Sequence, residues 1–331
     1  MSTLYLTEQG AVLKKTSQRL LVEKDGSTLL EIPAFQVDRI LIFGNVQVST
    51  QAINFLLERG IDVSFLSTHG KLRGRLTSTE SKNVFLRLAQ YDRFKDEDFK
   101  LSFAKNIIRG KMKNQKTLLY RYQRNHPEVD FSDSIETIDQ CLSQVGYKKQ
   151  MESVLGLEGS ATGAYFKSFS RMLRKGLGFE KREHRPSPDP VNALLSFGYV
   201  LITNEIDGIL ESLGFDPFIG FLHGIRYGRR SLALDLVEEF RHPVIDMFTV
   251  TLINLGVFKE NDFFRTSDGG VRMERDALKR YFEHYEKRLE RPFSEQTTDQ
   301  KVSLRKVFRH QAERLEKLIL EGEEYQPFLV Q

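Results

Sequence analysis

The chain has 331 residues, of which 40% are hydrophobic and 28% are charged. This apolar content is too high for a disordered chain, and the charge is too high for a membrane bundle. A single core rarely exceeds about 250–300 residues, so we expect two domains. Cys141, the one cysteine, excludes a disulfide framework and a zinc site of several cysteines. With neither a secretory signal nor a membrane-length apolar run visible, we expect a soluble, cytoplasmic protein.

The net charge of +4 hides an uneven distribution of basic residues. Residues 104–124 carry seven lysines and arginines and no acidic residue, and residues 167–186 carry seven against two glutamates. Arg226, Arg229 and Arg230 form a third cluster. A single charge run is usually a solvated surface. Three basic clusters in a chain whose remainder is acidic favour binding to a polyanion such as nucleic acid.

The first 80 residues are predicted to form a small antiparallel β domain with one inserted helix. Asp25-Gly26 indicates a hairpin, because a type I′ turn needs positive φ at both central residues. Ser49 is a suitable N-cap for a short helix over residues 50–59, which ends at Gly60. The predicted strands are 20–23, 28–32, 37–43, 46–48, 61–65 and 71–76.

From about residue 81 the hydrophobic period changes to that of an α-helix. Asp189, as N-cap before Pro190, opens one of these helices. Ser231 opens a further helix, in which Pro243 marks a kink or restart near Arg241. A hairpin is expected around residues 267–270. The other helices are predicted over residues 81–93, 97–124, 134–145, 148–173, 190–212, 274–289 and 299–321.

These elements predict an α+β fold. Residues 1–80 form a small N-terminal antiparallel β domain, similar to a β-sandwich, and residues 81–331 form a larger all-α domain. The strand edges of the β domain make it the candidate dimerisation surface, and the helical domain carries the candidate catalytic residues.

Two motifs place a titratable side chain in an unusual setting. Glu158 follows the apolar stretch 154–157 and precedes small residues, which would allow a ligand to approach closely. A solvated helix glutamate and a functional one are equally consistent with this pattern. His223 lies in segment 220–224, which begins and ends with glycine and precedes the third basic cluster. A lone histidine is usually structural, but arginine forks match phosphate geometry and favour a functional one here.

A third motif is the acidic helix that Ser231 opens. Asp235 and Glu238 share one face three residues apart, and Asp235 and Glu239 share one four apart. The simpler explanation is that acids are favourable in the first turns of a helix. The functional explanation is that one carboxylate joins Glu158 and His223 to offer two oxygens and a nitrogen to a divalent cation. Such mixed ligands suit Mn²⁺, and carboxylate oxygens suit Mg²⁺.

Acidic residues among basic clusters are typical of phosphodiester chemistry. A cation activates the attacking oxygen or stabilises the leaving one, while arginines hold the phosphates. Carboxylates beside phosphates would repel them unless a cation lay between. The residues therefore predict a bound divalent metal.

Five blocks of sequence then follow one another in a recognisable order. They are Lys111-x-x-Asn114-Gln115, Glu158-Gly159 through Tyr165-Phe166, Asp189-Pro190-x-Asn192-x-x-Leu195-Ser196-x-Gly198-Tyr199, Gly220-Phe221-Leu222-His223-Gly224, and Ser231-Leu232-Ala233-Leu234-Asp235-Leu236-x-Glu238-Glu239-Phe240-Arg241. Each block alone is weakly specific, but five in order are strongly specific. Over essentially its whole length the chain resembles Cas1, the universal CRISPR-associated endonuclease and integrase of spacer acquisition, and most closely its type I-C branch.

The resemblance implies a metal-dependent DNA endonuclease that also joins new spacers into the CRISPR array by transesterification. It implies Glu158, His223 and Glu238 as catalytic residues and as ligands of Mg²⁺ or Mn²⁺. Asp235 stays open as a residue behind these ligands or as a ligand of a second cation. It further implies a homodimer through the β domain, and two such dimers bridged by a dimer of a small ferredoxin-like second adaptation protein.

With double-stranded or branched DNA as the polyanion, the basic clusters are expected to bind the DNA backbone without reading its sequence. The residues predicted to contact DNA are Lys111, Asn114, Lys116, Arg182, Arg185, Arg226, Arg229 and Arg230. Two alternatives remain open. One is a catalytically silent scaffold that binds nucleic acid, and the other is a nuclease for structured RNA with the same metal chemistry.

Overall fold

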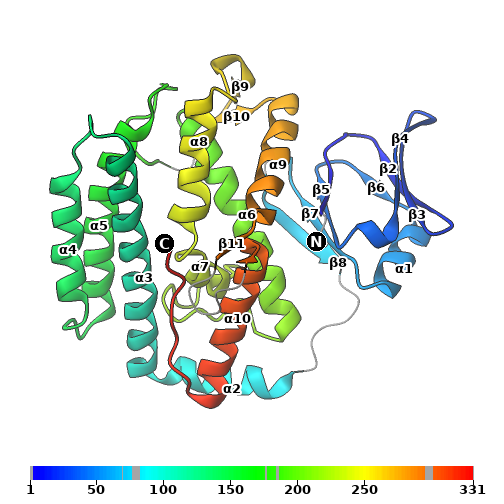
Figure 1. Ribbon diagram of the computed structural model, residues 1–331. Coiled ribbons are helices and arrows are strands. Elements are labelled where there is room, and N and C mark those ends of the chain that lie inside the picture. The colour runs from blue at the N-terminus through cyan, green and yellow to red at the C-terminus, as the bar shows by residue number, and fades with distance from the viewer. Residues whose placement is uncertain are drawn as a thin grey trace. The chain divides into compact units, whose positions relative to one another are not determined.

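The structure is a computed structural model that describes residues 3–68, 70–76, 83–175, 177–183, 186–294 and 301–330. It divides the chain into two compact units, Met1–Glu80 and Ser81–Gln331. Strands dominate the first unit, and long helices dominate the second (Figure 1). The predicted α+β class, with a β-rich part before a larger helical part, is confirmed. The dimerisation and catalytic roles given to the two parts stay predictions.

The described strands of the first unit form two four-stranded sheets, ordered β1-β5-β7-β8 and β4-β3-β2-β6. The helix α1 (Thr50–Glu58) follows β6, and Ser49 caps it by accepting a hydrogen bond from the backbone nitrogen of Ala52. The strands are β1 (Thr3–Leu6), β2 (Val12–Thr16), β3 (Arg19–Lys24), β4 (Ser27–Pro33), β5 (Arg39–Phe43), β6 (Gln47–Val48), β7 (Asp62–Leu66) and β8 (Leu72–Leu76).

The expectation of a purely antiparallel domain needs correction, because the pairing is mixed. The hairpin of β3 and β4 forms as predicted, with φ of 50° at Asp25 and 78° at Gly26. However, β5 pairs in parallel with both β1 and β7, and β6 pairs in parallel with β2. Parallel neighbours need a crossover connection, and α1 supplies one between β5 and β7. Apolar side chains from both sheets and from α1 share one core, as in a sandwich.

The second unit is built mainly from helices, whose bounds lie within a few residues of the predicted ones except at the start of α10. In it α3, α4 and α5 pack against one another, and α6 packs against α7 and α10. The helices are α2 (Val84–Lys95), α3 (Glu97–Asn125), α4 (Ser132–Val145), α5 (Met151–Met172), α6 (Pro190–Leu213), α7 (Ser231–Val237), α8 (Met247–Leu255), α9 (Arg275–Glu290) and α10 (Leu304–Glu321).

Helix α6 packs against several other elements of the second unit. Its N-terminus is the predicted one, because Asp189 accepts from the backbone nitrogen of Asn192 at 2.9 Å and Pro190 occupies the first turn. The helix ends at Gly214, which adopts a left-handed φ of 107°. By length and composition α6 could cross a membrane, but 72% of its most apolar window is buried inside the structure. The apolar surface of α6 is therefore that of a core helix.

The predicted kink at Pro243 is a turn of π-helix, η2 (Arg241–Asp246), between α7 and α8. Proline lacks the N–H that an α-helix needs at this position, and π-turns are frequent at functional sites. Two short strand pairs interrupt the predicted all-α unit. One is the expected hairpin of β9 (Phe263–Arg265) and β10 (Val271–Met273). The other, β11 (Phe293–Ser294) with β12 (Lys301–Val302), was not expected.

Candidate active site

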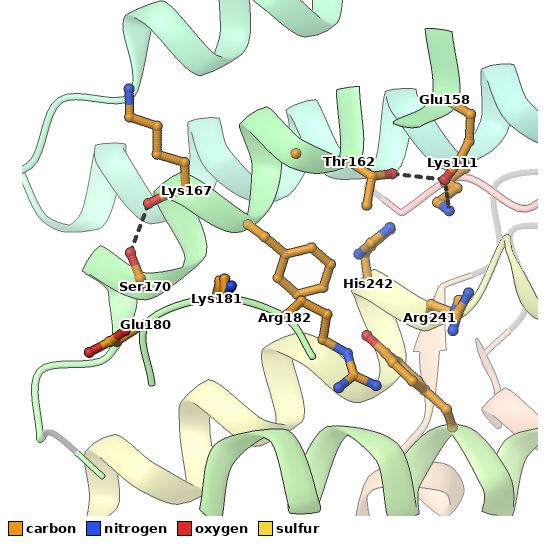
Figure 2. Close-up of a pocket in the computed structure, with 13 residues that line it drawn as sticks. Lys111, Glu158, Thr162, Lys167, Ser170, Glu180, Lys181, Arg182, Arg241 and His242 are labelled. Carbon is orange, nitrogen blue, oxygen red and sulfur yellow. Dashed lines mark hydrogen bonds and ion pairs between the residues drawn. The ribbon is translucent and has the colours of Figure 1, made fainter. Parts of the chain in front are cut away.

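The centre of the candidate site is a buried lysine on α3. The side chain of Lys111 is only 4% exposed. Its ammonium nitrogen contacts Oε1 of Glu158 on α5 and lies 2.6 Å from Oε2 of Glu238, the residue that caps the end of α7. Figure 2 shows the contact between Lys111 and Glu158 at the edge of a pocket. The fold therefore brings two of the predicted metal ligands to one point.

Positive charges hold Glu238 in its ionised form. Burial raises the pKa of the Glu238 carboxyl, but the charges of Arg241 and Lys111 outweigh this and bring the pKa well below its usual range. Arg241, three residues further on, donates from Nη1 to Oε1 of Glu238 at 2.7 Å. Burial alone would lower the pKa of Arg241, whereas Glu238 raises it above its ordinary value. The two charges therefore stabilise each other.

Asp235 orients His223 toward Glu238. Its Oδ1 lies 2.7 Å from Nδ1 of His223 and accepts from the backbone nitrogen of the same residue at 2.9 Å, while Oδ2 accepts from the backbone nitrogens of Phe221 and Leu222. A carboxylate only accepts, so Nδ1 carries a proton, and in the neutral imidazole Nε2 is the nitrogen with the lone pair. Nε2 lies 3.9 Å from Oε1 of Glu238. Both oxygens of Asp235 are thus engaged behind the histidine, as is common for partners of metal-binding histidines.

The loop that carries His223 is fixed by close packing. A Cβ on Gly220 would stand 2.7 Å from Cβ of Ser231 and 2.9 Å from Oδ2 of Asp235, so only glycine allows this approach. Arg229 donates from Nη2 to the backbone oxygen of His223 and from Nε to Oγ of Ser231. The glycine and the arginine of this motif therefore serve the position of the imidazole.

The donor set fits a divalent cation, although it is not assembled around one. In the described ranges, no three His, Cys, Asp or Glu side chains are placed to hold an ion. The reason is local, since the Lys111 ammonium lies between the two carboxylates. Carboxylate oxygens and a neutral imidazole nitrogen are ligands of Mg²⁺ and Mn²⁺. Nε2 of His223 and Oε1 of Glu238 are 3.9 Å apart. One cation can bind both atoms, because two metal–ligand bonds of about 2.1 Å each span that distance.

Asn114, which was predicted to contact DNA, is buried in this structure. Its buried amide donates from Nδ2 to the backbone oxygens of Glu239 at 3.0 Å and Phe328 at 2.9 Å, and its Oδ1 accepts from Val330. The amide therefore binds the C-terminal segment to α3. Lys111, also predicted to bind DNA, is buried between carboxylates and presents no free charge at the surface. The basic helix is amphipathic, and these two positions lie on its inner face.

Most of the other predicted DNA contacts are engaged with protein groups. Lys116 pairs with Asp139 at 2.5 Å, and Arg230 forms ion pairs with Asp207 and Glu211 on α6. Arg226 is exposed.

The guanidinium of Arg182 is also bound to the protein. It donates from Nη1 to Asn192 at 2.7 Å and from Nη2 to Ser196 at 3.0 Å. Arg185 lies outside the described residues.

A pocket of about 560 Å³ adjoins Glu158 (Figure 2). Lys111, Glu158 and Arg241 form one end of its wall, and Lys167, Lys181 and Arg182 contribute further positive charge. The side chains of Phe166 and Tyr199 give it aromatic surface. The other lining residues are Thr162, Gly163, Ser170, Glu180 and His242.

Sequence reasoning missed the pairing of Lys111 with the acids and the places of Arg241 and His242. The spacing of Glu238 and Arg241, three residues apart, could have indicated their ion pair. No pattern in the sequence indicates that His242 lies beside α3, because that contact joins segments far apart in the chain.

Comparisons with known proteins agree with this architecture. Residues 4–287 match the family described as CRISPR associated protein Cas1. A relative from Chlorobaculum tepidum, named CRISPR-associated endonuclease Cas1 1, is 34% identical over 88% of this chain and 89% of its own length. The chain belongs to the Cas1 family.

Two solved structures share its fold. A casposase bound to integration product superposes with a TM-score of 0.87 at 26% identity, covering 99% of this chain and 93% of the casposase. A chain of a Cas6-RT-Cas1–Cas2 complex superposes with a TM-score of 0.82 at 26% identity, covering 99% of this chain and 36% of that larger one. The fold is thus shared with an integrase-like protein and with a Cas1 unit that occurs with Cas2.

Proposed function

We propose that the chain is a metal-dependent DNA endonuclease and integrase of CRISPR adaptation, which inserts new spacers into the array by transesterification. One observation carries the proposal. Glu158 and Glu238 meet at Lys111, and Nε2 of His223 lies 3.9 Å from Oε1 of Glu238. The names of the relative and of the casposase structure support the same activity.

The chain's own residues have distinct roles in this proposal. Glu158, Glu238 and Nε2 of His223 would hold Mg²⁺ or Mn²⁺, with Asp235 keeping the proton on Nδ1 so that Nε2 can coordinate. When bound, the cation would lower the charge on the phosphate and favour attack by an oxygen nucleophile.

Lys111 and Arg241 act together with these ligands. Their charges balance the two carboxylates in the metal-free chain and would add to the attraction for phosphate when a cation is bound. A cation bound to all three ligands requires the Lys111 ammonium to move from between the acids.

The pocket beside Glu158 suits the end of a DNA strand. Lys167 and Lys181 line it together with Arg182, and Phe166 offers a face on which a base can stack. The attacking group would be water in cleavage and a DNA 3′-hydroxyl in joining. One metal centre can serve both, because each reaction moves a phosphodiester by in-line attack of an oxygen.

Two donor ends require two copies of this site. We therefore include in the proposal a homodimer through the first unit, and a small ferredoxin-like partner dimer that bridges two such dimers. The solved Cas1–Cas2 complex supports the use of a partner protein. The type I-C branch and a cytoplasmic location stay predictions from the sequence.

A strand-joining assay tests the function. The full chain and its partner would be incubated with Mn²⁺, a supercoiled plasmid that carries a repeat, and donor DNA with free or blocked 3′ ends. We expect covalent joining of the free donor alone, and loss of joining in Glu158→Ala. Equal joining of both donors would contradict the integrase, and cleavage of single-stranded RNA alone would favour an RNA nuclease. Binding without cleavage or joining would favour a silent scaffold.

A further inference from the structure

Behind Glu158, a chain of hydrogen bonds links three helical segments. Thr162, one turn along α5, donates from Oγ1 to Oε1 of Glu158 at 2.9 Å. Gln115 on α3 donates from Nε2 to Oγ1 of Thr162 at 3.1 Å, and the same nitrogen lies 2.9 Å from Nε2 of His242 on η2. Nδ1 of His242 lies 2.6 Å from Oδ2 of Asp246. Figure 2 shows the end of this chain, where Thr162 joins Glu158 beside His242.

The chemistry of the groups fixes the direction of every hydrogen bond. The Asp246 carboxylate accepts at both oxygens, since Tyr199 donates to Oδ1 at 2.5 Å. Nδ1 of His242 therefore carries its proton, and Nε2 can only accept. Burial lowers the pKa of His242, which keeps the ring neutral. The two hydrogens of the Gln115 amide then go to His242 and Thr162. The Thr162 hydroxyl accepts one of them, so its own hydrogen points to Glu158.

The orientation of the Gln115 amide depends on these two acceptors. Among the described residues, Oε1 of Gln115 is buried and has no hydrogen-bond partner. The amide oxygen therefore does not decide which way the group faces. In the reversed orientation, this oxygen would meet Nε2 of His242 and Oγ1 of Thr162 and leave His242 without a donor. The tautomer of His242, which Asp246 sets, thus decides the direction of the Thr162 hydrogen bond.

The consequence falls on one oxygen of Glu158. Thr162 and Lys111 both contact Oε1, so the plane of the carboxylate is held and Oε2 is the oxygen left for a cation. The hydroxyl of Ser160 on the same helix has a different partner, because it donates to the backbone oxygen of Gly156.

We propose that Thr162 and Gln115, oriented by the buried His242–Asp246 pair, are positioning residues that hold the Glu158 carboxylate for the divalent cation. This inference rests on the proposed metal centre. It adds to that centre a set of side chains reaching from α5 through α3 to the π-turn. None of the four is among the proposed ligands of the cation.

Mn²⁺ titration of the full chain without DNA tests the inference, with free Mn²⁺ measured by electron paramagnetic resonance. Thr162→Val keeps the shape of the side chain and removes the donor, and we expect it to raise the Mn²⁺ dissociation constant about 10-fold, within the range seen for residues behind metal ligands. Thr162→Ser restores the hydroxyl and should stay within about twofold of the wild type. Ser160→Ala, the matched control, should leave the constant unchanged.

A double-substitution cycle shows whether the residues act as one chain. Gln115→Leu should weaken Mn²⁺ binding less than Thr162→Val does, and the double variant should bind no more weakly than Thr162→Val alone. Thermal unfolding without metal reports separately on any loss of fold. Unchanged affinity in Thr162→Val, failure of Thr162→Ser to restore it, or fully additive effects would overturn the inference while leaving the metal centre intact. A wild-type chain that binds no Mn²⁺ would overturn both.

Discussion

Glu238 and Glu239 are adjacent, and both are buried at the end of α7, yet they face opposite surroundings. Glu238 lies beside Lys111 and Arg241, whose charges outweigh burial and hold its pKa below the usual range. We call Glu238 with Lys111 and Arg241 the cationic side of the turn that follows α7. Its two positive charges surround a carboxylate that stays ionised and points toward Glu158 and His223.

Glu239 lies on what we call the neutral side. Tyr325 donates to its Oε1, while Gln311 at 2.7 Å and the backbone nitrogen of Phe328 at 2.5 Å donate to Oε2. Burial is the largest influence here and raises the pKa of Glu239 to about 7. The residue binds the C-terminal segment to the helices. The charges around each carboxylate, and not the residue type, therefore decide which of the two glutamates can take part in chemistry.

The largest difference should appear when each glutamate loses its charge. Glu238→Gln removes a proposed metal ligand, so DNA cleavage should fall more than about 100-fold, beyond the upper range for residues behind such ligands. Glu239→Gln should keep Mn²⁺ affinity within about twofold, because its side chain bonds only the C-terminal side. Single-turnover cleavage and Mn²⁺ titration of both variants measure this. If Glu239→Gln were the inactive one, the comparison would be reversed.

Removing the cation of the cationic side should cost stability. Lys111→Met leaves two carboxylates without their shared partner, and breaking a buried ion pair typically costs about 3–5 kcal/mol. Denaturant unfolding of the metal-free chain measures the loss, and added Mn²⁺ should restore part of it.

Lys116→Met is the matched control for this experiment. It lies on the same helix and breaks the partly exposed pair with Asp139 and a contact with the ring of Tyr120, so its cost should be about 1 kcal/mol or less. Equal losses for the two variants would show that Lys111 is not the partner that the acids require.

The neutral side predicts a pH dependence of stability. The folded pKa of Glu239, about 7, lies above the ordinary value of 4.5, so the folded state binds the extra proton between these values. The protonation of Glu239 therefore adds about 3 kcal/mol to the free energy of unfolding below about pH 4.5, and this contribution is lost as the pH rises toward 7. Unfolding of the wild type and of Glu239→Gln, which mimics the protonated acid, should differ in slope within this window alone. Parallel curves would contradict a buried, protonated Glu239.

Much of this architecture could be predicted from the sequence, because periodicity and caps are local. Asp25-Gly26 located a hairpin, and Asp189-Pro190 located the start of α6. The parallel pairing of β1 with β5 could not be predicted, since it depends on crossovers and not on a turn signal.

In the site, the motifs identified Glu158, His223 and Glu238 as candidates, but the meeting of Glu158 and Glu238 at Lys111 joins three segments that are far apart in the chain. The burial of Asn114, predicted to contact DNA, could not be predicted for the same reason. The sequence of a basic and polar helix gives the spacing of these residues, but it does not show which of their side chains are buried.

The smallest expected effect concerns the surface around the cationic side. Lys167 is exposed and lines the pocket next to Glu158, whereas Lys317 is exposed on α10, the helix that supplies Gln311 to the neutral side. Removing one lysine that neutralises a phosphate should reduce the slope of log K against log salt by about 0.7–0.9. Lys167→Gln should therefore lower the slope by this amount for DNAs of unrelated sequence, and Lys317→Gln should leave it unchanged. Fluorescence anisotropy at several salt concentrations measures both. An equal change in the two variants, or a change for one DNA sequence only, would mean that the pocket is not where the DNA backbone meets this protein.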